Sequence, residues 1–114
     1  MLIASKHKLN NLVLIIDYNK IQALSKLEDA LPLNSLVNKI KSFKWNCIEI
    51  KNGHSFKELI PKFSKKFKNS LPTAIIVNTI KGKGLKKFEK DPSWHARKLQ
   101  GTELEYGKKI LGIK

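Results

Sequence analysis

Three short, nearly all-apolar runs constrain the fold of this chain more than any other feature of its sequence. They are rich in β-branched residues and do not alternate between apolar and polar positions as a strand with one wet face would. Continuous runs of this kind are typical of strands buried on both faces of a parallel sheet. The predicted strands are residues 12–16 (LVLII), 47–50 (CIEI) and 73–77 (TAIIV).

Helical spacing separates and follows these strands. After the first strand, Asn34 or Ser35 can cap a helix whose apolar positions are Leu36, Val37, Ile40 and Phe43. After the second, the pattern Ser55-x-x-Glu58 predicts a capping box, and Pro61 is expected to kink or delay the helix. The apolar stripe of that second helix is Phe56, Leu59, Ile60, Phe63 and Phe67.

The remainder of the chain is expected to hold one long loop and one more helix. Residues 80–100 have no clear period, and loops of this length are usually functional or disordered. A second capping box, Thr102-x-x-Glu105, predicts a helix that runs toward Leu111. The strand–helix order predicts an α/β fold in which a mostly parallel sheet of about three strands is flanked by helices. We expect one domain over residues 1–114 and no second domain.

Composition and charge narrow the classes of function. Apolar residues make up 41% of the chain, no run is long enough to cross a bilayer, and the start lacks a signal peptide. Cys47 is the single cysteine and is expected to be a buried structural thiol. Together these features predict a cytoplasmic protein that is not inserted in a membrane. The net charge is +14, but Arg97 is the only arginine among 23 basic residues, and the lysines are dispersed. Specific nucleic-acid recognition favours arginine, so we expect none.

Candidate functional residues follow the first and third strands, because ligands of parallel sheets bind beyond the carboxyl ends of the strands. Asp17 and Asn19 could offer oxygens to a cation such as Mg²⁺, or could simply form a turn. Gly82 and Gly84 permit close backbone approach to a phosphate, although a solvated turn is an alternative. His95, in the long loop, is a candidate proton carrier or phosphate donor, or a structural histidine.

The order of the motifs carries a resemblance. The motifs are 17–22 (DYNKIQ), 43–50 (FKWNCIEI), 52–54 (NGH), 72–84 (PTAIIVNTIKGKG) and 94–95 (WH). Together they resemble the amino-terminal subunit of split transketolases and the corresponding domain of full-length ones, from about Ser5 through the last helix. The resemblance implies part of a three-layer thiamine-diphosphate-binding fold. It also implies transfer of a two-carbon ketol unit between sugar phosphates, with the carbon chemistry carried by the cofactor.

The resemblance also implies roles for particular residues. In the family a divalent cation, Mg²⁺ or Ca²⁺, bridges the cofactor's diphosphate to the protein. Asn19 matches the side-chain ligand after the strand, and Ile21 matches the residue whose backbone carbonyl is a ligand. Gly82 and Gly84 match the glycine loop beside the cofactor. His95 matches the histidine near the diphosphate and the reacting end of the substrate.

Two parts of the family's site lie outside residues 1–114. The aspartate of an upstream Gly-Asp-Gly motif is the third metal ligand, and the cofactor is activated by a glutamate of the pyrimidine-binding domain that follows, in the same chain or in another one. Since the chain begins at Met1, too late for the first, we expect the remainder of the transketolase to be a required partner. We expect the isolated chain to be inactive, with an unpaired edge on its first strand. A small basic nucleic-acid-binding module and an interaction protein are the alternatives.

Overall fold

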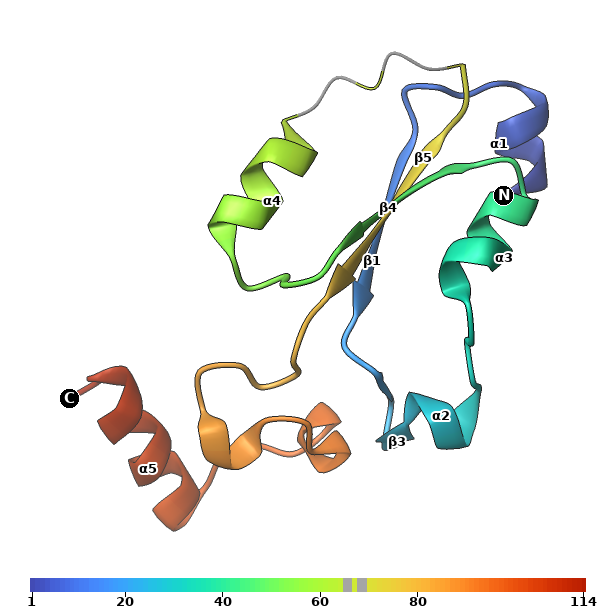
Figure 1. The fold of residues 1–114 in the computed structure, drawn as a ribbon. Helices are drawn as coiled ribbons and strands as arrows, with labels where there is room; N and C mark the ends of the chain where they lie inside the picture. The colour runs from blue at the N-terminus through green and yellow to red at the C-terminus, as the bar shows by residue number, and fades with distance from the viewer. Residues whose placement is uncertain (65–66, 68–69) are drawn as a thin grey trace. The chain divides into compact units, whose positions relative to one another are not determined.

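The computed structural model describes residues 1–64, 67 and 70–114 and divides into two compact units (Figure 1). Unit 1 comprises Met1–Asn19 and Leu33–Thr79. Unit 2 comprises Lys20–Pro32 and Ile80–Lys114. In the part of the chain that is described, no helix is both long and apolar enough to span a membrane.

A three-stranded parallel sheet forms the centre of unit 1. Its strands are β1 (Val13–Tyr18), β4 (Asn46–Ile50) and β5 (Thr73–Asn78), in the order β1-β5-β4. The three predicted strands are confirmed, with ends that differ by one or two residues. The predicted α/β class with a parallel sheet and flanking helices is therefore correct.

The central strand β5 supplies most of the core. Thr73 through Val77 are all buried, and Ala74 and Ile75 are 0% exposed. Because successive side chains of a strand point to opposite faces, β5 contributes residues to two separate apolar clusters. Ala74 and Ile76 belong to one cluster, and Ile75 and Val77 belong to the other.

Helices cover both faces of the sheet, which gives unit 1 three layers (Figure 1). On one face, α1 (Leu2–Lys6) and α3 (Leu36–Ser42) bring Ala4 and Ile40 onto Ala74 and Ile76. On the other face, α4 (Phe56–Phe63) brings Leu59 onto the cluster of Ile50, Ile75 and Val77.

Burial of the first strand differs from the prediction. β1 pairs with β5 on one side only, and Val13, Leu14 and Ile15 are exposed, Ile15 by 56%. An edge strand can carry the same apolar run as a central one, so the sequence pattern does not separate the two. The expected unpaired edge is confirmed for the described residues, and exposed apolar edges favour association with another chain.

The predicted caps lie at the right positions but make different contacts. Ser35 and Ser55 are the N-cap residues of α3 and α4, yet neither side chain makes a capping hydrogen bond. Ser35 adopts a left-handed backbone conformation with φ 55°. The Glu58 carboxylate accepts from the backbone N–H of Asn52 at 3.1 Å, so no capping box forms there.

The second predicted helix is also shorter than expected. Pro61 does not delay it, because α4 begins at Phe56 and runs through Pro61 to Phe63. Phe67 lies outside the helix but still packs on the cluster of Ile50, Ile75 and Val77. Of the predicted stripe, Phe56, Ile60 and Phe63 are exposed, so only Leu59 of this helix packs on that cluster.

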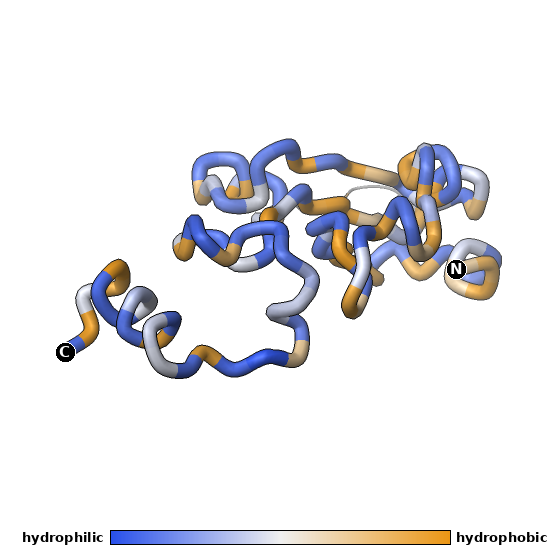
Figure 2. The backbone as a smooth tube through the Cα atoms, turned by 90° about the horizontal axis from the view of Figure 1, so that it is seen from below, coloured by the Kyte–Doolittle hydropathy of each residue, from blue (hydrophilic) through white to orange (hydrophobic). Residues whose placement is uncertain are grey.

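Unit 2 consists of short elements and one longer helix. They are β2 (Ile21–Gln22), β3 (Ser25–Lys26), α2 (Leu27–Ala30), the 3₁₀ helices η1 (Lys86–Phe88) and η2 (Pro92–His95), and α5 (Gly101–Leu111). The predicted long loop therefore contains two helical turns. The N-cap of the last helix is Gln100 rather than Thr102, and Glu105 pairs with Lys108 instead of forming a capping box. Hydrophilic and hydrophobic stretches alternate along α5 (Figure 2).

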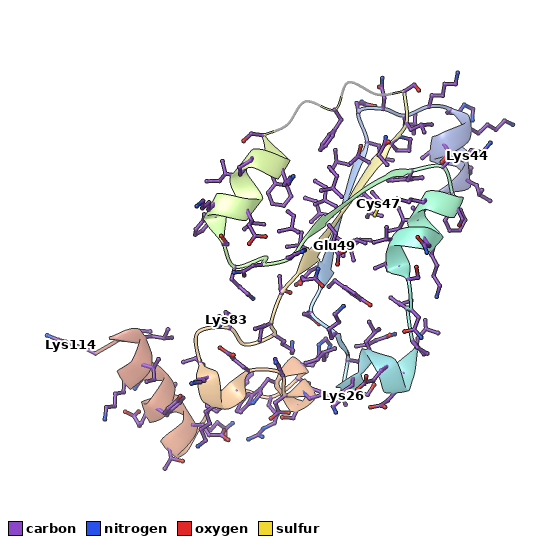
Figure 3. All side chains as sticks on the ribbon, viewed as in Figure 1. Lys26, Lys44, Cys47, Glu49, Lys83 and Lys114 are labelled. Carbon is purple, nitrogen blue, oxygen red and sulfur yellow. The ribbon has the colours of Figure 1, made fainter. Side chains whose placement is uncertain are left out.

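Cys47 is half-buried rather than fully buried. It lies on β4 and packs at the margin of the cluster under α3 (Figure 3). Burial raises the pKa of its thiol, the positive charge of Lys41 opposes the shift, and Glu49 adds to it. A thiol with a raised pKa is a poor nucleophile at neutral pH, which fits a packing role.

The turn between α3 and β4 provides a test of local backbone strain. Lys44 has φ 60°, and its N–H donates to the carbonyl of Lys41 at 2.9 Å, the position after a helix where glycine is preferred. We expect Lys44→Gly to raise the free energy of unfolding by about 0.5–1 kcal/mol. Urea denaturation measures this. The matched control is Lys41→Gly inside α3, which should lower the free energy of unfolding by about 1 kcal/mol. A loss of stability in Lys44→Gly would contradict the interpretation that the left-handed backbone of Lys44 is strained.

Candidate functional site

Asn19 lies where the sequence predicted, at the carboxyl end of the sheet. It directly follows β1, whose last residue Tyr18 is in register with Asn78, the last residue of β5. Asn19 is half-buried. The preceding Asp17 belongs to β1, in register with Val77, and accepts a hydrogen bond from the Thr79 hydroxyl. The hypothesis that residues 17–20 are only a turn is therefore wrong for Asp17 and Tyr18.

A sharp turn leads from Asn19 to Ile21. Lys20 adopts a left-handed backbone with φ 66°, and its carbonyl accepts from the N–H of Leu27 at 2.9 Å. Ile21 then pairs with Lys26 in the short antiparallel β2–β3 ladder. Ile21 and His95 both belong to unit 2, where β3 contacts η2, the helical turn that ends at His95. Unit 2 therefore brings the segment of Ile21 and the segment of His95 into one small assembly.

The glycine loop is a tight, hydrogen-bonded turn. The Leu85 N–H donates to the Gly82 carbonyl at 3.1 Å, and the Lys90 N–H donates to the Lys81 carbonyl at 3.0 Å. Gly82 has φ 76°, and a Cβ on it would lie 2.8 Å from the Phe88 carbonyl oxygen. Only glycine fits there, because any side chain would collide with backbone. Gly84 has φ 104° but has open space around it.

One lysine of the loop is engaged by a carboxylate. The Lys83 Nζ lies 3.6 Å from the Glu89 Oε1, and the same oxygen accepts from the Gly84 N–H at 3.4 Å (Lys83 is labelled in Figure 3). Glu89 thus holds both the side chain of Lys83 and the backbone N–H of Gly84. An incoming anion would compete with this carboxylate for Lys83.

His95 is exposed at the end of η2, and an aromatic cluster supports that helical turn. The Phe88 ring lies 4.4 Å from the Trp94 ring and 5.5 Å from the Tyr106 ring on α5. The Arg97 guanidinium stacks 4.4 Å above Trp94, and its Nη2 donates to both carboxylate oxygens of Glu103 at 2.9 and 3.1 Å. His95 therefore lies at the end of a helical turn whose neighbouring Trp94 is packed by this cluster.

The sequence alone did not predict this cluster. In the sequence Arg97 stands out only as the solitary arginine, and Phe88 belongs to no recognisable motif. The available signal was a set of three aromatic residues, Phe88, Trp94 and Tyr106, in an otherwise polar stretch. No single hydrophobic period relates the three residues, because each lies on a different element: Phe88 on η1, Trp94 on η2 and Tyr106 on α5.

Asp91 begins η2 and caps it. Its Oδ1 accepts from the Ser93 N–H at 2.9 Å. Hydrogen bonds from Ser93 lower the pKa of the Asp91 carboxyl, and the charge of Arg97 lowers it further. The charged form of Asp91 is therefore the form that stabilises the turn.

The family of the chain follows from comparison with known proteins. The family model described as "Transketolase, thiamine diphosphate binding domain" matches residues 1–114. The chain belongs to this family, so the class inferred from the motifs is confirmed.

Individual relatives agree with the family assignment. An apulose-4-phosphate transketolase subunit of Phocaeicola vulgatus is 35% identical over 92 residues, which are 80% of this chain and 32% of that protein. Human transketolase is 37% identical over 109 residues, 92% of this chain and 16% of that protein. A crystal structure of Campylobacter jejuni transketolase superimposes with a TM-score of 0.85 at 25% identity, covering 99% of this chain and 18% of that one. The chain thus spans a third or less of these relatives.

The two glycines of the loop allow a matched test. We expect Gly82→Ala to break the bonds donated by Leu85 and Lys90 and to cost about 1–3 kcal/mol, because the new Cβ would meet the Phe88 carbonyl. Gly84→Ala should keep both bonds, since nothing lies within 4 Å, although its φ of 104° disfavours any L-residue and lowers stability by itself. Amide chemical shifts of Leu85 and Lys90, with thermal denaturation, measure both. Retention of both hydrogen bonds in Gly82→Ala would contradict the clash.

The lowered pKa of Asp91 predicts a pH dependence. Its contribution to the stability of η2 is complete above the ordinary aspartate range and is lost as the pH falls through its lowered folded-state value. The indole N–H resonance of Trp94 should therefore shift on acidification, and Asp91→Asn should flatten the shift. Asp29→Asn, on α2, is the control. A shift that survives in Asp91→Asn would assign it to another group.

Proposed function

We propose that the chain supplies part of the thiamine-diphosphate site of a transketolase that transfers a two-carbon ketol unit from a ketose phosphate to an aldose phosphate. The observation that carries the proposal is the position of Asn19, an amide at the carboxyl end of a parallel strand, where ligands of such sheets bind. When bound, thiamine diphosphate supplies the electron sink for breaking and making the carbon–carbon bond.

The donor chemistry of this chain fits a cation-bridged diphosphate in part. Asn19 would give an amide oxygen and Ile21 a backbone carbonyl oxygen, both hard donors of the kind that Mg²⁺ prefers. Among residues 1–64, 67 and 70–114, no three His, Cys, Asp or Glu side chains gather to hold a metal ion. The cation would therefore need a carboxylate from elsewhere, together with phosphate oxygens and water.

The glycine loop and His95 have distinct proposed roles. Without a Cβ at Gly82 or Gly84, backbone N–H groups can come close to a diphosphate oxygen. His95, exposed at the end of η2, would hold or move a proton at the reacting oxygen of the substrate and donate to phosphate. Asp91 and the aromatic cluster would keep its backbone in place.

A partner completes the proposed enzyme. Relatives that are named as transketolase subunits, among them the Phocaeicola vulgatus protein, support a second polypeptide, and the match covers only 32% of that subunit's own length. We propose that the partner region comprises the upstream Gly-Asp-Gly segment, whose aspartate binds the cation, and the following pyrimidine-binding domain or subunit, whose glutamate reaches the cofactor's pyrimidine ring. Residues 1–114 alone would then neither hold the cofactor tightly nor turn over.

Variants of Asn19 and His95 test the residue assignments in the complex with the partner region. Asn19→Ala should weaken cofactor affinity in the presence of Mg²⁺ by about tenfold or more, since one oxygen ligand to the cation is lost. His95→Ala should lower turnover by about a hundredfold, with a much smaller effect on cofactor affinity. Calorimetry and a coupled ketol-transfer assay measure the two quantities.

Each variant has a matched control on the chain. The controls are Asn11→Ala and His7→Ala. Asn11 precedes β1, at the opposite end of the strand from Asn19, and His7 follows α1; both side chains are exposed. Neither control should change affinity or turnover. Wild-type affinity in Asn19→Ala together with a wild-type rate in His95→Ala would overturn the assignments even though the family is established.

A further inference from the structure

The carboxyl ends of β1 and β5 are joined by a side-chain hydrogen bond. The Thr79 hydroxyl donates to Oδ1 of Asp17, two residues before Asn19. Asp17 pairs in register with Val77, so its side chain lies on the same face of the sheet as that of Thr79, two residues after Val77. The bond therefore links the point where the chain leaves β1 to the point where it leaves β5.

Thr79 is itself held from its other side. The Gly53 N–H donates to the Asn78 carbonyl at 2.7 Å, so the turn after β4 lies against the end of β5. A Cβ on Gly53 would lie 2.7 Å from Cγ2 of Thr79 and 2.4 Å from Cγ1 of Val77. The methyl group of Thr79 is thus packed, while its hydroxyl is directed to Asp17.

The chain beyond Asp17 needs such support. Lys20, directly after Asn19, has φ 66°, a conformation that L-residues rarely adopt unless their surroundings hold them. Asp17 was a candidate cation ligand in the sequence, but its Oδ1 is occupied by the hydroxyl of Thr79. A carboxylate held in this way fixes the end of β1, from which Asn19 leaves the sheet.

We propose that Asp17 and Thr79 form a positioning pair that fixes the exit of β1 and thereby places Asn19 for the cation of thiamine diphosphate. The inference rests on the proposed role of Asn19. Groups that orient a metal ligand commonly change metal affinity by about 10–100-fold when removed. Both residues belong to unit 1, so the pair forms within a single compact unit.

Four variants separate positioning from general stability. Thr79→Val removes the hydroxyl at nearly constant shape, Thr79→Ser restores it, and Asp17→Ala removes the acceptor. Glu49→Ala is the charge-matched control, because its Oε1 accepts a cross-strand bond from Asn78 Nδ2 at 2.9 Å on the β4 side of the same sheet end (Figure 3). The control also removes one carboxylate and one side-chain bond between strands.

The first measurement uses the chain alone and does not depend on the cofactor. Amide hydrogen exchange at Asn19 and Lys20 should become at least about threefold faster in Thr79→Val and Asp17→Ala, and should stay at the wild-type rate in Thr79→Ser and Glu49→Ala. Unchanged exchange in Thr79→Val would overturn the positioning pair, whatever the role of Asn19.

The second measurement uses the complex with the partner region. Calorimetric affinity for thiamine diphosphate with Mg²⁺ should fall about tenfold in Thr79→Val and Asp17→Ala, recover in Thr79→Ser, and stay within about twofold in Glu49→Ala. Turnover at saturating cofactor should be unchanged. Wild-type affinity in Thr79→Val, with weakened affinity in Asn19→Ala, would overturn the positioning role alone. Wild-type affinity in Asn19→Ala would instead overturn the proposed metal ligand and the cofactor part of this inference.

Discussion

Burial of β5 between two parallel neighbours is the constraint on which the rest of unit 1 depends. Thr73 to Val77 are inaccessible on both faces, and each pairs in register with a residue of β1 and one of β4. A one-residue slip would exchange the cluster under α1 and α3 with the cluster under α4, so the register is strongly fixed. That register brings the ends of β1 and β5 side by side and so determines where Asn19 leaves the sheet.

The sequence predicted the elements whose signal is local and strongly apolar. The run around Ile75 and the strands on either side of it were recognised because buried parallel strands have a composition of their own. The side-chain caps at Ser55 and Thr102 were wrong, because alternative acceptors and donors in the folded chain compete with the local pattern. The apolar run around Ile15 did not predict its exposure, since such a run does not say whether its strand is central or at an edge; the unpaired edge was expected only from the resemblance.

The candidate site was predicted mainly from motif order rather than from physics. Asn19 and Gly82 occupy positions that suit their implied roles, at a strand end and at a positive φ with no room for a Cβ. The supporting contacts were not predictable, because they join residues far apart in sequence. The hydroxyl of Thr79 reaches Asp17 across 62 positions, and the rings of Phe88 and Tyr106 meet only when η1 and α5 pack.

We propose that this chain holds part of a cofactor site and needs a partner region to complete it. Calorimetric titration of thiamine diphosphate with Mg²⁺ into residues 1–114, with and without a partner region that carries the Gly-Asp-Gly segment and the pyrimidine-binding domain, tests it most directly. A coupled ketol-transfer assay on the same samples reports turnover. We expect no tight binding and no turnover by the chain alone, and both in the complex. Micromolar cofactor affinity with turnover by residues 1–114 alone would contradict it.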